Sequence, residues 1–108
     1  MKIWVDDIRP APDGYMWCKS VNTAMARIWY LEVLCASFPS ARMKYQIELI
    51  DMDHDAGEYA EEGGDYIELL EWFEETGRSY PVRIHSMNPV GVENMRRIIQ
   101  RNGWTEVK

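Results

Sequence analysis

Short apolar runs that end abruptly in acidic or polar residues constrain the fold of this chain more than any other feature. The clearest of these runs cover residues 2–5, 47–52 and 82–85. The first ends in Asp6 and Asp7, the second in Asp53, and the third is followed by Ser86. Apolar runs of this length, bounded in this way, predict buried β-strands. Weaker signals predict two further strands, over residues 17–21 and 104–107.

Segments with the spacing of amphipathic helices separate these runs. Apolar residues at helical spacing indicate a first helix: Met25, Ile28, Leu31 and Cys35. Asn22 is expected to cap its start and Pro39 to mark its end. The same spacing indicates a second helix: Tyr66, Leu69, Leu70 and Phe73. We expect a capping box of Asp65 and Glu68 to open this helix and Gly77 to stop it.

A third helix is bounded by residues of the types that open and close helices. Asn88 and Pro89 are expected to begin it, and Asn102 and Gly103 to end it. Between them, apolar residues recur at helical spacing: Val92, Met95 and Ile99. The segment from Asp7 to Trp17, in contrast, is rich in proline and shorter than the usual crossover between parallel strands. Either an unusual loop leads to an edge strand here, or a first helix has been lost.

Strands that alternate with helices predict a single α/β domain over residues 1–108, and this length fits one domain. We expect a mostly parallel sheet of about five strands, covered by helices on both faces. Ligands of such sheets bind outside the carboxyl ends of the strands. That edge should gather the polar residues that follow the strands: Asp6, Asp7, Asp53, Asp55, His85 and Ser86.

Composition excludes several classes of function. The formal net charge of −6 argues against general nucleic-acid binding and against membrane-surface binding, because both depend on clustered Lys and Arg. No apolar run approaches the ~18 residues that span a bilayer, and the first residues lack the features of a signal peptide. We therefore expect a cytoplasmic protein. Cys18 and Cys35 have neither metal-binding nor disulfide-framework spacing, and we assign them no function.

The acidic residues at two strand ends suggest a metal site. Asp6, Asp7, Asp53 and Asp55 would repel one another at one edge of a sheet, and a divalent cation such as Mg²⁺ or Mn²⁺ would neutralise them. Mg²⁺ in particular is held by one or two carboxylates together with water and substrate phosphate. The alternative is that these aspartates cap turns and face solvent.

Two histidines lie close to this acidic edge. His54, between Asp53 and Asp55, could be a general acid or base, a metal ligand, or a loop residue packed on the next helix. His85 could protonate a leaving oxygen, or be a histidine of the core. Ser86, Asn88 and the amides at the following helix start could hold an anion, although Asn88 is also the expected N-cap.

Arg9 is the cation closest in sequence to the acidic pair. It could bind a phosphate through two hydrogen bonds, or simply neutralise Asp6 or Asp7. The acidic, glycine-containing segment from Ala56 to Gly64 could close over the site, or be an ordinary surface loop.

Three ordered motifs resemble the cyclic-phosphate-processing receiver domain family. They are Asp6-Asp7-Ile8-Arg9-Pro10, Asp53-His54-Asp55-Ala56-Gly57 and His85-Ser86-Met87-Asn88-Pro89-Val90-Gly91. The resemblance extends over nearly the whole chain, and it implies a receiver-like, flavodoxin-type fold with its first and last helices reduced or absent.

The resemblance also implies roles for particular residues. Asp6 and Asp7 match the acidic pair that binds Mg²⁺ in receivers, Asp53 matches the aspartate that accepts a phosphoryl group, and Ser86 matches the hydroxyl residue after the fourth strand. The two histidines are additions to the receiver pattern. Lys108 lies at the end of the last predicted strand, whereas the receiver lysine precedes a further helix.

The leading hypothesis is a metal-dependent phosphoesterase that opens a cyclic phosphate on a nucleotide or an RNA end. Asp53, His54 and His85 would be catalytic, and Arg9, Ser86 and Asn88 would bind the phosphate. One alternative is a receiver-like or pseudo-receiver signalling module with Asp53 as phosphoacceptor. Another is a non-enzymatic module that binds a nucleotide or a partner protein. The expected partner is thus a small phosphorylated ligand or an RNA end.

Overall fold

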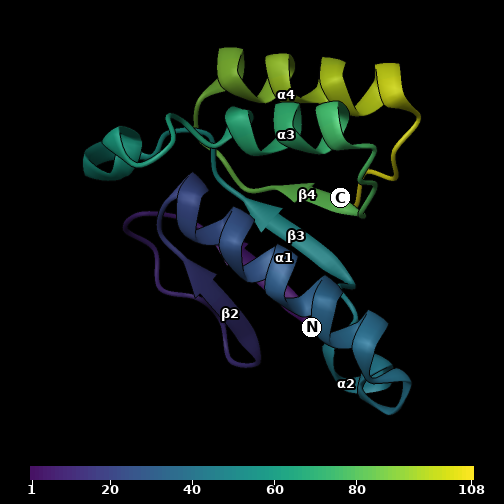
Figure 1. Ribbon diagram of the computed structural model, residues 1–108. Coiled ribbons are helices and arrows are strands. Elements are labelled where there is room, and N and C mark those ends of the chain that lie inside the picture. Colours follow the sequence, from purple (N-terminus) through teal and green to yellow (C-terminus); the bar gives the residue numbers. More distant parts are fainter.

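Four short strands form one parallel sheet in the order β2-β1-β3-β4. Figure 1 shows β2, β3 and β4, with α1 in front of the sheet. The computed structural model describes all residues from Met1 to Lys108. The strands are β1 (Lys2–Val5), β2 (Tyr15–Cys18), β3 (Leu49–Met52) and β4 (Val82–Ile84). The helices are α1 (Val21–Ser37), α2 (Arg42–Tyr45), α3 (Ile67–Thr76) and α4 (Pro89–Asn102). Two 3₁₀ turns are η1 (Pro39–Ala41) and η2 (Gly57–Glu61).

The register of the strands aligns their carboxyl ends. Val5 at the end of β1 pairs with Met52 at the end of β3, and Met52 pairs with Ile84 at the end of β4. The residues that follow these strands therefore lie side by side. Hydrogen bonds continue the alignment by one residue, because Asp53 N–H donates to the Val5 carbonyl and His85 N–H to the Met52 carbonyl.

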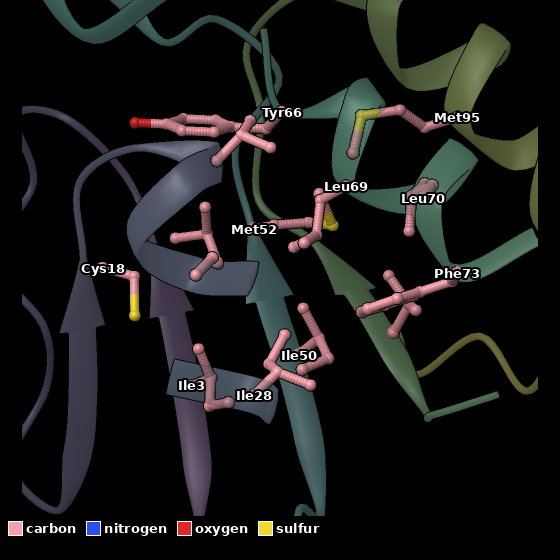
Figure 2. Packing of buried hydrophobic residues seen from close by; sticks show 14 of the residues in the cluster. Ile3, Cys18, Ile28, Ile50, Met52, Tyr66, Leu69, Leu70, Phe73 and Met95 are labelled. Carbon is pink, nitrogen blue, oxygen red and sulfur yellow. The ribbon is translucent and has the colours of Figure 1, made fainter. Parts of the chain in front are cut away.

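One face of the sheet carries the hydrophobic core. Side chains alternate along each strand, and those on this face are fully buried: Ile3, Val5, Ile50, Met52 and Val82. Figure 2 shows Ile28 of α1, Leu69 and Phe73 of α3 and Met95 of α4 packed in the same cluster. Helices α1, α3 and α4 thus all cover the same face of the sheet.

The other face of the sheet has no helix on it. The residues that point to this face, which we call the open sheet face, are Lys2, Trp4, Tyr15, Trp17, Leu49, Asp51 and Arg83. Lys2 and Arg83 are exposed, and the aromatic rings are partly exposed. The expectation of helices on both faces is therefore wrong. Residues 6–14 form a loop, and residues 103–108 contain no helix, so no helix packs on this face.

The β1–β2 connection resolves the open question about this segment. β2 is an edge strand parallel to β1, and no helix lies between them. The strand lies two to three residues earlier than predicted, because Ser20, and not Asn22, caps α1. The Ser20 hydroxyl accepts a hydrogen bond from Thr23 N–H at 3.0 Å. Ser and Asn cap equally well, so their residue types alone do not separate the two positions.

The predicted capping box at α3 is also wrong. The Asp65 carboxylate accepts a hydrogen bond from Ala56 N–H at 3.0 Å, and α3 begins after Tyr66 with no side-chain cap. Asp65 thus holds the loop that follows β3. The end of α3 is as predicted, since Gly77 has φ of 72°, in the left-handed region that glycine adopts readily.

The bounds of α4 confirm the sequence prediction. The Asn88 side chain accepts from Gly91 N–H, Pro89 is the first helical residue, and Gly103 ends the helix in the left-handed conformation. The fifth strand expected over residues 104–107 is reduced to a single parallel bridge between Val82 and Glu106. No helix of the protein is both long enough and apolar enough to cross a membrane.

Candidate functional site

Three carboxylates converge at the carboxyl edge of the sheet. Asp6 and Asp7 follow β1, Asp53 follows β3, and one oxygen from each lies within 4.8 Å of the others. We call these three residues the carboxylate cluster. The parallel register of β1 and β3 explains the convergence, because it places the residues after Val5 and Met52 next to each other.

Asp6 is the most constrained member of the cluster, with a relative exposure of 1%. Its Oδ1 accepts hydrogen bonds from Ile8 N–H at 2.9 Å and Arg9 N–H at 3.0 Å, and its Oδ2 contacts His85 Nε2 at 2.9 Å. Burial by itself would raise the pKa of Asp6. The hydrogen bonds outweigh burial, so the pKa lies below its usual value and the carboxylate stays ionised.

Asp7 is in a less favourable electrostatic position. Burial, followed by the negative charges of Asp6 and Asp53, raises the pKa of Asp7. The loop after β3 lies close to this carboxylate at Gly57. A Cβ atom at residue 57 would lie 2.3 Å from Asp7 Oδ2, and the φ of 54° there also favours glycine. The backbone at Gly57 therefore packs against Asp7, which lies next to the two other acids of the cluster.

The donor set of the cluster fits a hard divalent cation. Three carboxylate oxygens within 4.8 Å are ligands of the kind that Mg²⁺ and Mn²⁺ take. Burial, and then the charges of Asp6 and Asp53, raise the pKa of Asp7, and a bound cation would favour its ionised form. Asp55 lies outside the cluster, since its carboxylate contacts His54 Nδ1 at 2.8 Å and Asn88 Nδ2 at 3.3 Å.

His85 is held between two buried carboxylates. Its Nε2 contacts Asp6 Oδ2 at 2.9 Å, and its Nδ1 contacts Asp51 Oδ1 at 2.6 Å. Its ring stacks on Trp4, with centroids 3.8 Å apart and planes 7° apart. An ionised carboxylate can only accept, so both nitrogens must carry hydrogen when both aspartates are ionised. His85 thus orients Asp6 from behind the carboxylate cluster.

Asp51 is a site residue that the sequence analysis left out of its candidates. It is fully buried within β3, and its Oδ2 has no hydrogen-bond partner, with Arg83 Nη1 3.6 Å away. One signal could have identified it. Asp51 is an acid inside an otherwise apolar strand, and a buried charge needs a partner. His85, which directly follows the neighbouring strand β4, is that partner.

His54 differs from His85 in leaving one ring nitrogen free. Its Nδ1 contacts Asp55 Oδ1 at 2.8 Å, whereas its Nε2 makes no hydrogen bond within the protein. Helix α4 fixes the ring, because a Cβ at Gly91 would lie 2.4 Å from His54 Cγ. With Asp55 ionised, Nδ1 carries the hydrogen and the lone pair of neutral His54 lies on Nε2. That arrangement is suitable for a general base.

The turn between β4 and α4 offers hydrogen-bond donors to an anion. The Ser86 hydroxyl accepts from Asn88 N–H at 3.2 Å, and the backbone amides of Ser86 and Met87 make no hydrogen bond within the protein. Arg9 reaches the same turn, since its Nη1 donates to the His85 carbonyl at 3.2 Å. Arg9 therefore binds the backbone of the turn and forms no ion pair with Asp6 or Asp7.

Two other segments differ from simple expectations. The acidic segment after β3 contains η2, and its Glu62 carbonyl accepts from Asn22 N–H, so it is joined to the start of α1. A cavity of about 460 Å³ lies elsewhere, next to the amino ends of β3 and β4. Its lining includes Leu31, Cys35, Tyr45, Ile47 and Tyr80.

Comparisons with known proteins identify the family. No curated protein and no solved structure matches the chain. The family model of the cyclic-phosphate processing receiver domain matches residues 1–101, which include the whole sheet, the carboxylate cluster and both histidines. The order of the strand-end motifs and the parallel sheet agree with this match. The chain belongs to the cyclic-phosphate processing receiver domain family.

Proposed function

We propose that this protein is a metal-dependent phosphoesterase that opens a cyclic phosphate on a nucleotide or an RNA end. One observation carries the proposal. The carboxylate cluster, the free Nε2 of His54 and the unbonded amides of Ser86 and Met87 all belong to turns at the same edge of the sheet. Acidic oxygens, a base and anion donors together are what hydrolysis of a phosphodiester requires.

A divalent cation bound by Asp6, Asp7 and Asp53 would polarise a phosphoryl oxygen and lower the pKa of a bound water. The remaining contributions come from the chain itself. The amides of Ser86 and Met87, with the Ser86 hydroxyl, donate to the non-bridging phosphate oxygens. Arg9 holds this turn through the His85 carbonyl and adds positive charge beside it.

His54 acts as general base in this proposal. Its Nε2 takes a proton from the attacking water as the water oxygen bonds to phosphorus, and one ribose oxygen–phosphorus bond breaks. The released ribose oxygen takes up a proton, so one water is consumed and a phosphomonoester and a hydroxyl result. Asp55 orients His54 through Nδ1, and Asn88 contacts both Asp55 and the start of α4.

His85 has a different role from the one expected from sequence. Both of its ring nitrogens already contact carboxylates, so it is poorly placed to donate a proton to a leaving group. We assign it as a positioning residue for Asp6. Such residues behind a metal ligand fix the orientation of the ligand.

Calorimetric titration with Mg²⁺ and Mn²⁺ tests the metal site first. We expect binding to wild type and none to the Asp6→Asn/Asp53→Asn variant. The matched control is Asp13→Asn/Glu75→Gln, which removes two exposed acids outside the cluster and should bind as wild type does. Absence of binding to wild type would contradict the metal-dependent mechanism.

Turnover then tests the chemistry. A panel of 2′,3′- and 3′,5′-cyclic nucleotides with Mn²⁺ should yield a phosphomonoester from at least one member. His54→Ala should lower the rate by about 10²–10⁴-fold, the usual contribution of a general base. Ligand binding without turnover would instead favour the non-enzymatic module.

A phosphoacceptor function is the second candidate. Asp53 lies in the carboxylate cluster at the position of the receiver phosphoacceptor, and this placement favours the candidate. Acetyl phosphate with Mg²⁺ would then give an adduct with the mass of one phosphoryl group, and Asp53→Asn would abolish it. The absence of any adduct would count against signalling by phosphotransfer.

A further inference from the structure

The open sheet face combines aromatic rings with positive charge. Tyr15 and Trp17 of the edge strand β2 each have a lysine over the ring. Lys2 Nζ lies 5.6 Å from the Tyr15 centroid, and Lys19 Nζ lies 4.6 Å from the Trp17 centroid. Both lysines are exposed, and Tyr15 and Trp17 are partly exposed.

The charge of this face differs in sign from that of the whole protein. The exposed residues on this face, or at the carboxyl edge of the sheet beside it, include four cations: Lys2, Lys19, Arg83 and Arg9. The chain as a whole has a net charge of −6. Among the strand residues that point to this face, the only acid is Asp51, and it is fully buried. Asp13 and Glu48 lie beside Lys2 and Tyr15 at the amino end of the sheet. The exposed strand residues of the face itself are cationic, and they are therefore complementary to phosphate groups.

The open sheet face is continuous with the proposed active site. Trp4 stacks on His85, which contacts Asp6 of the carboxylate cluster. The indole N–H of Trp17 donates to the Asp6 carbonyl at 2.7 Å, and that of Trp4 donates to the Arg9 carbonyl at 2.8 Å. A ligand that extends from the carboxylate cluster across the sheet would thus pass directly over these rings.

We propose that the open sheet face binds the last nucleotides of a single-stranded RNA. Bases stack on Tyr15 and Trp17, and Lys2, Lys19 and Arg83 contact the backbone phosphates. This inference rests on the proposed function, because a cyclic phosphate that bridges neighbouring ribose hydroxyls at a strand end requires RNA. A short local site of this kind is compatible with an acidic protein, since few phosphates are neutralised.

Binding can be measured separately from hydrolysis. Fluorescein-labelled octauridine with a 3′-hydroxyl is titrated with wild type in EDTA, and anisotropy gives Kd at two salt concentrations. We expect Lys2→Glu/Lys19→Glu to raise Kd at least about tenfold and to reduce the salt dependence. Arg27→Glu/Arg97→Glu is the matched control, because it makes the same charge change on exposed residues of α1 and α4.

A second pair of variants tests stacking without changing charge. Tyr15→Ala should raise Kd at least about fivefold, as loss of one base–aromatic stack does. Tyr30→Ala removes an exposed tyrosine from α1, with 59% exposure, and should leave Kd unchanged. Circular dichroism of all four variants establishes that they are folded.

Three outcomes would overturn the proposal. Either no binding of octauridine by wild type, or equal losses in the face variants and their controls, would exclude RNA as the occupant. Sedimentation of wild type that reveals a dimer disrupted by Lys2→Glu/Lys19→Glu would assign the face to a second copy of the chain. Turnover of cyclic mononucleotides is measured independently. Failure of RNA binding would therefore not contradict the proposed function, which the turnover assay alone decides.

Discussion

At the scale of single residues, the pair of Asp51 and His85 has the clearest physical role. Asp51 is fully buried and bonds His85, which in turn bonds Asp6. Two buried carboxylates would be unfavourable without the imidazole between them. The chain thus uses a strand-internal acid to fix a histidine, and the histidine to fix a member of the carboxylate cluster.

His85→Gln tests this positioning role. Loss of a residue behind a metal ligand typically weakens metal affinity about 10–100-fold, and we expect a loss of that size for Mn²⁺ by calorimetry. Met87→Ala changes the same turn at a side chain that is 84% exposed, and it should bind Mn²⁺ as wild type does. Unchanged affinity in His85→Gln would show that Asp6 is oriented by its backbone hydrogen bonds alone.

Asp7 provides a pH-dependent prediction without metal. Its pKa is raised from 3.8, so the stability that it contributes is fully present below pH 3.8 and is lost as pH rises through the raised pKa. At pH 7 the ionised side chain repels Asp6 and Asp53. Asp7→Asn should therefore stabilise the metal-free protein at pH 7, on the order of 0.5 kcal/mol, and have no effect below pH 3.8.

Urea unfolding of both proteins in EDTA at pH 3.5 and pH 7 would measure this difference. Asp13→Asn is the control, because Asp13 is exposed and lies outside the cluster. Addition of Mg²⁺ at pH 7 should reverse the order, since wild type keeps all three ligands. Destabilisation of metal-free Asp7→Asn at pH 7 would contradict repulsion within the cluster.

At the scale of elements, α4 does more than pack on α3. Its Asn88 caps the helix and contacts Asp55, and its Gly91 provides the space for the His54 ring. Glycine inside a helix usually costs about 1 kcal/mol relative to alanine. Its presence at residue 91 is explained by the ring of His54, which a Cβ would meet at 2.4 Å from Cγ.

Gly91→Ala should therefore fail to give the usual stabilisation. We expect no gain in urea unfolding free energy and a cyclic-phosphate turnover at least about tenfold below wild type, because the His54 ring must move. A displaced catalytic group commonly costs this much or more. Val90→Ala, at a residue that is 68% exposed, is the control in the same turn of α4. A gain of about 1 kcal/mol with full activity would contradict the packing argument.

Local chemistry explains which elements the sequence predicts well. Asn88, Pro89 and Gly103 have specific backbone roles, so the bounds of α4 follow from residue type. The start of α1 is ambiguous because Ser20 and Asn22 both suit a cap, and in the structure it is the Ser20 hydroxyl that accepts from Thr23 N–H. Asp65 looked like a cap, but it binds Ala56 N–H across the loop. Such long-range partners cannot be read from spacing.

The site shows the same division. The convergence of Asp6, Asp7 and Asp53 follows from parallel strands that end in acids. The positions of the neighbouring acids relative to the cluster cannot be predicted in this way, because they depend on the direction in which each side chain points. Asp55 contacts His54, outside the cluster, and Asp51 points to the open sheet face next to His85.

At the scale of the whole molecule, the uncovered sheet face and the single core have one cause. Residues 6–14 and residues 103–108 form no helix, and the helices that contribute to the core, α1, α3 and α4, pack on one side of the sheet. The apolar residues of α1, α3 and α4 therefore form one cluster with the core-facing residues of the strands (Figure 2). A protein with a single core of this size is expected to unfold in one cooperative step.

Conservative truncations in two different helices of this core test that cooperativity. Ile28 of α1 and Ile99 of α4 are at most 1% exposed. Each change to valine should lower the unfolding free energy by about 0.5–1.5 kcal/mol, because it removes one buried methylene group. Circular dichroism, which follows the helices, and tryptophan fluorescence should report coincident urea transitions in both variants. If Ile99→Val shifted only one of these signals, α4 would unfold separately, and the helix that holds His54 in place would not share the stability of the sheet.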